Sequence, residues 1–279
     1  MIARKYAFSG IALVAAAVLL QSAPAHAISF ALTGEAAMQA SMKGLAGLNG
    51  ETDQGAYSIY AWDEGFNTVT FNNYDFTVTD SQNNVVDNAG IQYSTVGQTT
   101  NNARITKNVW APSYDQARDN KSAYSQVFAG TNLQIDLDET HNYFGINWGS
   151  AHNGNEFSFY NGENLVQKFV YFNDGRTFDD GKTVNVASTL QEYNTVGHGN
   201  QYNAYFNFFS ESENDIFNRI VISQKGGGGF ETDNHTFHAG TVGFESDPDV
   251  TDVPEPTAAL GLLAVGGLFV HRRFKRVKA

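Results

Sequence analysis

The chain has 279 residues, of which 13% are aromatic, and carries a formal net charge of −12 at pH 7 with no cysteine. Residues 28–252 are more acidic still, since they hold 28 acidic and 10 basic residues, a formal charge of −18. That charge argues against nucleic acid as a partner, because phosphates are repelled by it. The absence of cysteine excludes disulfides and thiolate zinc sites, so the chain has to fold on its core alone.

The amino terminus has the layout of a secretory signal peptide. Two basic residues precede an apolar run over residues 11–20, and the small residues Ala25 and Ala27 follow it. Signal peptidase reads small residues at such positions, so residues 1–27 are predicted to be removed after Ala27. The alternative is an uncleaved membrane anchor, for which the apolar run is short.

The body of the chain consists of short runs in which apolar and polar residues alternate, separated by turn residues. Alternation of this kind predicts β-strands, and only residues 35–48 have a spacing compatible with a helix. The predicted strands cover residues 57–62, 66–71, 74–79, 103–110, 132–137, 143–148, 156–160, 164–172, 183–188, 204–209, 216–223 and 237–244.

Asn161-Gly162 is the clearest hairpin signal, because both residues accept the positive φ of a tight turn. Many short strands with regular turns predict an all-β fold. We expect one β-sandwich, jelly-roll or lectin-like, over residues 28–246.

Oxygen-rich turns make calcium a candidate cofactor of this acidic body. Calcium prefers carboxylate and carbonyl oxygens. Glu231 and Asp233 are the predicted ligands of one structural calcium ion. The alternative is turn chemistry, in which Asp and Asn bond to their own backbone. His235 and His238 are three residues apart, which places their rings on opposite faces of a strand and prevents them from sharing a metal.

Trp110 is the candidate platform for a sugar, since it precedes Ala111-Pro112 at the end of a predicted strand. Packing in the core is the alternative for this ring. No local motif joins a pair of carboxylates, and no Ser-His-Asp arrangement with a nucleophile elbow is present. No catalytic residue is therefore assigned, and the chain is predicted not to be an enzyme.

The carboxyl terminus combines three elements in order. After a linker at residues 247–252 comes a Pro-Glu-Pro sequence, then the 14 uncharged residues 257–270, then a basic cluster. A spanning helix needs about 20 residues, and Arg272 and Arg273 can extend this one by reaching to the interface. The pattern predicts a short membrane helix with its basic end inside. The alternative is a buried helix of the soluble domain.

This layout resembles the PEP-CTERM sorting signal, which is also known as the ice-binding-protein-like C-terminal region. The residues that carry the resemblance, within residues 253–279, are Val253, Pro254, Glu255, Pro256, Arg272 and Arg273. The resemblance implies that an exosortase cleaves near the Pro-Glu-Pro sequence and that the protein reaches the surface of a Gram-negative-type bacterium, or its surroundings.

A second resemblance concerns the body. Residues 142–150 and 157–162 are similar to the central hairpin of a group of exosortase-dependent surface proteins, and residues 229–234 are similar to the segment before their last strand. This resemblance implies a sandwich of the lectin or carbohydrate-binding type.

Together these patterns predict an exported surface or matrix protein with a non-catalytic structural or adhesive role. The first alternative is a carbohydrate-binding module that engages exopolysaccharide, and the second is a glycoside hydrolase.

Overall fold

The computed structural model describes residues 27–33, 64–72, 75–80, 82, 84–87, 89–97, 103–107, 123–193 and 202–244. Several predictions concern residues outside these ranges. They are the helix at 35–48, the strand at 57–62, Trp110, the linker, most of the signal peptide and the whole segment 253–279.

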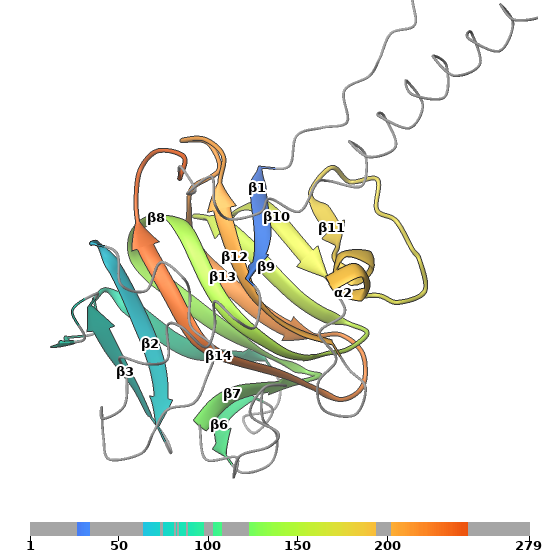
Figure 1. Ribbon diagram of the computed structural model, residues 1–279, viewed down its shortest axis with the longest axis horizontal. Helices are drawn as coiled ribbons and strands as arrows, with labels where there is room; N and C mark the ends of the chain where they lie inside the picture. The colour runs from blue at the N-terminus through green and yellow to red at the C-terminus, as the bar shows by residue number, and fades with distance from the viewer. Residues whose placement is uncertain are drawn as a thin grey trace, which may run out of the picture.

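Within the described ranges, fourteen strands form one hydrogen-bonded sheet (Figure 1). The strands are β1 (Ile28–Thr33), β2 (Phe66–Asn72), β3 (Asp75–Asp80), β4 (Val85–Val86), β5 (Ile91–Gly97), β6 (Ala103–Lys107), β7 (Ala123–Phe128), β8 (Thr131–Ala151), β9 (Asn155–Asn161), β10 (Asn164–Val170), β11 (Thr183–Asn185), β12 (Tyr202–Ser210), β13 (Phe217–Gln224) and β14 (Gly229–Ala239). The sheet is mixed, because β10 and β11 run parallel whereas β8 pairs antiparallel with its neighbours.

Strand β8 is 21 residues long and connects two parts of the sheet. Its first part, from Thr131 to Leu137, lies between β5 and β13. Its second part, from Tyr143 to Ala151, lies between β12 and β14. The first part alternates between buried and half-buried residues, whereas the second part is buried on both faces.

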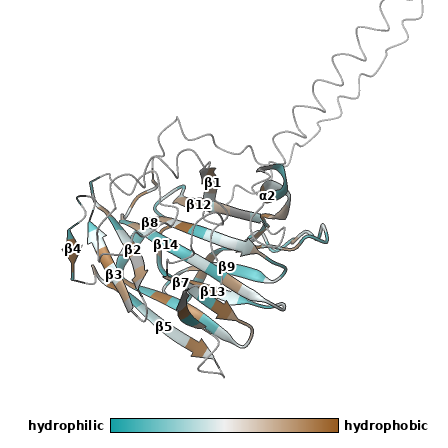
Figure 2. Ribbon diagram, turned by 60° about the horizontal axis from the view of Figure 1, so that its bottom comes forward, coloured by the Kyte–Doolittle hydropathy of each residue, from teal (hydrophilic) through white to brown (hydrophobic). Residues whose placement is uncertain are grey.

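Aromatic rings join strands that are not hydrogen-bonded neighbours. Trp148 of β8 meets Phe157 of β9 with ring centroids 4.9 Å apart, and Phe157 meets Phe230 of β14 at 4.8 Å. Phe169 of β10 meets Phe208 of β12 at 4.7 Å. Rings from strands that are not neighbours in the sheet therefore meet in one hydrophobic core. Hydrophobic and hydrophilic residues lie interspersed along the strands that enclose it (Figure 2).

The prediction of an all-β fold is confirmed, because strands dominate the described residues and helix is almost absent. The hairpin around Asn161-Gly162 is also confirmed. It joins β9 to β10, and Gly162 has a φ of 58° in the turn.

Four strand predictions were wrong in detail. The strands expected at 132–137 and 143–148 form one continuous β8, and β14 begins at Gly229 rather than at residue 237. The strand expected at 183–188 ends at Asn185. There the Asn185 Oδ1 accepts a hydrogen bond from the Ala187 N–H, 3.3 Å away, at the start of helix α2 (Ala187–Tyr193).

The expected central hairpin of residues 142–150 and 157–162 is not formed. β8 and β9 follow each other in the chain, yet both pair with β13 and not with each other. Their aromatic side chains meet across the core instead. In the part of the chain that the structure describes, no helix has the length and apolar character needed to cross a membrane.

Candidate functional site

A groove of about 350 Å³ opens between strands of the two parts of the sheet. Strands β2 and β3 supply Phe71 and Phe76, and β5 supplies Tyr93. Arg104 of β6 and Ser125 of β7 line the same groove. Pockets of this size, with apolar walls and a few polar groups, are the usual form of a small-ligand site.

Three aromatic rings form one wall of the groove. Phe71 is 5% exposed and meets Tyr93 edge-on, with ring centroids 5.8 Å apart. Phe76 lies 4.8 Å from Tyr93, and both of these rings are only partly buried. Phe71 therefore supports the wall, whereas Phe76 and Tyr93 present ring surface to the groove.

A chain of hydrogen bonds runs behind the groove and joins two of its lining residues. The Tyr93 hydroxyl lies 2.8 Å from Nδ1 of His235, and Nε2 of His235 lies 3.0 Å from Oγ1 of Thr232. Thr232 Oγ1 lies 2.5 Å from Oγ of Ser125. Both His235 and Thr232 are fully buried in β14, so this strand fixes Tyr93 on one side of the groove and Ser125 on the other.

Burial keeps this chain uncharged. It lowers the pKa of His235 to about 3, so the imidazole is neutral at physiological pH. Burial, with the nearby charge of Asp233, raises the pKa of Tyr93 well above its usual value. A neutral imidazole has one N–H donor and one acceptor nitrogen, so the chain has a single direction at any moment.

Arg104 lies at the exposed edge of the groove and is held loosely. Its Nη2 donates to Oε1 of Gln126 at 3.4 Å, and its guanidinium lies 5.5 Å from the ring centre of Phe128. Gln126 in turn donates to Oε1 of Glu231 at 2.9 Å. The guanidinium keeps further N–H groups for a ligand, because it has five donors.

The predicted calcium ligands lie in strand β14 and not in a turn. Glu231 is 6% exposed and Asp233 is 1% exposed, and Asp233 Oδ1 accepts a hydrogen bond from the Asn234 N–H at 2.8 Å. Asp233 is paired with Asn147 across the β8–β14 ladder. Within the described ranges no group of three or more His, Asp or Glu side chains gathers as a metal site.

The two histidines of β14 point to opposite sides, as the spacing predicted. His235 meets the ring of Phe144 at 5.6 Å on the core side, whereas His238 meets Phe66 at 4.7 Å and hydrogen-bonds Asn142.

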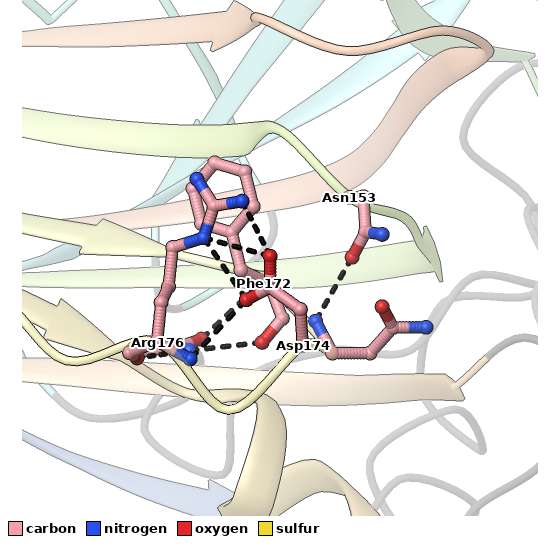
Figure 3. A network of polar contacts seen from close by, with 6 residues as sticks. Asn153, Phe172, Asp174 and Arg176 are labelled. Atoms are coloured by element: carbon pink, nitrogen blue, oxygen red, sulfur yellow. Dashed lines mark hydrogen bonds and ion pairs between the residues drawn. The ribbon is translucent and has the colours of Figure 1, made fainter.

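A second group of polar contacts fixes the loop after β10 (Figure 3). The guanidinium of Arg176 lies 4.0 Å from the ring centre of Phe172 and pairs with Asp174, which lowers the pKa of that carboxyl. The Asn173 N–H donates to Asn153 Oδ1 at 2.9 Å. The Arg176 guanidinium lies over the ring of Phe172, so this loop is a structural feature and not an open platform.

The structure tests few of the other predicted site residues. Trp110, Ala25 and the sorting residues from Val253 to Arg273 lie outside the described ranges. Ala27 lies directly before β1, and its N–H donates to Oε1 of Gln167 at 3.2 Å. Sequence reasoning missed Phe76, Tyr93, Arg104 and Ser125, because they come together only through strand pairing.

Comparison with known proteins gives little guidance. No protein-family model matches the sequence, and no curated protein matches it either. Among solved structures, the enzymatically active domain of tailspike protein 4 of bacteriophage CBA120 matches with 14% identity and a TM-score of 0.24. The match covers 55% of this chain and 21% of that one.

The prediction that this chain is not an enzyme is contradicted by that match, because the matched domain is enzymatically active, and it does not stand. The low identity and TM-score give no argument for a particular fold, substrate or reaction.

The buried histidines predict how stability depends on pH. The pKa of His235 is about 3 and that of His141 about 4, mainly through burial, whereas an unfolded histidine titrates near 6.5. Their stabilisation is therefore complete above about pH 6.5 and is lost as the pH falls toward these values. Each histidine should remove up to about 1.4 kcal/mol of unfolding free energy per pH unit.

Urea unfolding at several pH values between 7 and 4 measures this loss. His235→Asn should give a shallower decline than the wild-type protein. Equal slopes for both proteins would show that His235 is not buried as a neutral side chain.

Proposed function

We propose that this chain is an exported surface protein that binds polysaccharide in the groove between β5 and β6. The observation that carries the proposal is the pair of partly buried rings, Phe76 and Tyr93, facing a groove that also holds Arg104 and Ser125. Sugar rings have an apolar face that packs on aromatic rings and hydroxyls that need polar partners. A protein that binds extracellular polysaccharide in this way would have a structural or adhesive role in the envelope or matrix.

We propose further that the doubled sheet is a β-sandwich of the jelly-roll or lectin-like type. The ring contacts between β9 and β10 on one side and β8, β12 and β14 on the other support it, because sandwiches bury the inner faces of two sheets against each other.

The terminal segments supply the proposed route. Signal peptidase removes residues 1–27, and exosortase acts at Pro254-Glu255-Pro256 after the helix at 257–270 has entered the membrane. The charge of −18 on residues 28–252 suits a protein that stays soluble outside the cell.

The groove proposal predicts a loss of affinity in one variant. Phe76→Ala should weaken binding to polysaccharide about fivefold, because a stacked ring contributes about 1 kcal/mol. Affinity electrophoresis on a panel of polysaccharides measures the change. Val85→Ala is the control, since Val85 is 66% exposed on β4 and does not line the groove. Equal retention of wild type and Phe76→Ala would remove this ring from the site.

The sorting proposal predicts the carboxyl terminus of the mature protein. Mass spectrometry of the exported protein should find an end near Pro256 in cells with exosortase and a longer chain in cells without it. An end at Ala279 in both strains would overturn the proposal.

Calcium remains a proposal that rests on two buried carboxylates, Glu231 and Asp233. An ion that binds only the folded state stabilises it, so chelator should lower the melting temperature and added calcium should restore it. Identical melting curves with and without chelator would reject the ion.

A further inference from the structure

The hydrogen-bond chain Tyr93–His235–Thr232–Ser125 begins and ends at the same groove. Tyr93 and Ser125 both line it, while the two residues between them are fully buried. The chain has two possible directions. If the Tyr93 hydroxyl donates to His235, the Ser125 hydroxyl keeps its hydrogen for a ligand in the groove. If the Ser125 hydroxyl donates to Thr232, the Tyr93 hydroxyl keeps its hydrogen for the ligand.

The chemistry of the two ends selects the direction. A phenol is a stronger hydrogen-bond donor than an aliphatic hydroxyl, so the Tyr93 hydroxyl donates to Nδ1 of His235. The neutral imidazole then donates through Nε2 to Thr232, and Thr232 donates to Ser125. The hydrogen of the Ser125 hydroxyl is thereby left for the groove.

The charged group of the groove is also a donor. Arg104 has no acceptor atom, and its guanidinium uses one nitrogen for Gln126. Arg104 is paired with Gln126 in the β6–β7 ladder, whereas Ser125 is paired with Ile105, so the guanidinium and the Ser125 hydroxyl lie on opposite faces of that hairpin. A ligand that satisfies Ser125 therefore presents an oxygen that accepts a hydrogen bond. A carbonyl oxygen suits this arrangement better than a hydroxyl, because it has two lone pairs and no hydrogen to place.

The remaining lining is apolar. Phe71, Ala103 and Leu133 are buried, and Ile105 lies two positions after Ala103 on β6. These side chains offer no partner to a hydroxyl, but they suit a methyl group. A carboxylate is less suited than a neutral carbonyl, because the charge of −18 on residues 28–252 repels an anionic polymer.

We propose that the groove selects a sugar that carries an acetyl group. The carbonyl oxygen accepts from Ser125, and the methyl group packs on Phe71, Ala103 and Leu133. The inference rests on the proposed function, because it names the sugar that the polysaccharide-binding groove takes.

The test compares hexasaccharides with one backbone and different substituents. Isothermal titration of the purified protein with chitohexaose and cellohexaose isolates the acetamido group, since both are β-1,4-linked. We expect chitohexaose to bind at least about tenfold more tightly, the value of a well-made hydrogen bond. Hexagalacturonate is the anionic comparison and should bind more weakly than chitohexaose.

The outcomes distinguish the claim that the groove prefers an acetylated sugar from the claim that it binds glycan at all. Equal affinities for chitohexaose and cellohexaose, or a preference for hexagalacturonate, would overturn the acetyl inference and leave a glycan groove. Failure to bind any hexasaccharide or polysaccharide would overturn the proposed function itself.

Two variants test the hydrogen-bond chain. Ser125→Ala should reduce the ratio of chitohexaose to cellohexaose affinity severalfold, because the carbonyl oxygen loses its donor while the contacts of the methyl group remain. Tyr93→Phe keeps the ring and removes the hydroxyl that donates to His235, so it should lower the same ratio while the ring still stacks on the sugar. A ratio that stays at the wild-type value in Ser125→Ala would show that Ser125 does not contact the substituent.

Discussion

The continuity of β8 is the constraint on which the rest of the structure depends. A single strand of 21 residues pairs with β5 and β13 through its first part and with β12 and β14 through its second. The same strand contributes Leu133 and Ile135 from its first part and Phe144 and Trp148 from its second part to one hydrophobic core. The two parts of the sheet cannot move apart without breaking this strand. Leu133 of the first part also lines the groove.

Strand β14 positions two residues of the groove, and its two faces carry different side chains. On the core side, Thr232 and His235 hold Ser125 and Tyr93 by hydrogen bonds. On the other side lie the buried carboxylates Glu231 and Asp233. A β-bulge follows Asp233 in the strand, and Asn234 within it has a φ of 49°. The bulge shifts the register of the strand, so Thr232 and His235 both face the core although they are three residues apart. A strand without the bulge would place only one of them there.

Features that depend on neighbouring residues in the sequence could be predicted. Alternating residues predicted most of the strands, and the Asn-Gly pair predicted the hairpin between β9 and β10. The spacing of His235 and His238 predicted their opposite directions. The position of Glu231 and Asp233 within a strand was not predicted, because oxygen-rich residues are typical of turns and strand pairing with β7 and β8 overrode that tendency.

The groove could not be predicted, because its residues come from six strands between Phe71 and Leu133. Tyr93 and Ser125 stand 32 positions apart, and what joins them is a third strand more than a hundred positions later. No short motif records such a contact. The continuous β8 was missed for a related reason, since the polar residues Asp138, Glu139 and Thr140 resemble a turn. In the folded chain they belong to the strand itself.

The central claim is that a neutral His235 directs the hydroxyl of Ser125 toward the groove. The most direct measurement is the nitrogen NMR spectrum of histidine-labelled protein near pH 7, with His235 assigned by comparison with His235→Asn. The account predicts a neutral ring with hydrogen on Nε2 and an unprotonated Nδ1 that accepts from Tyr93. A ring protonated at Nδ1 alone, or at both nitrogens, would contradict it.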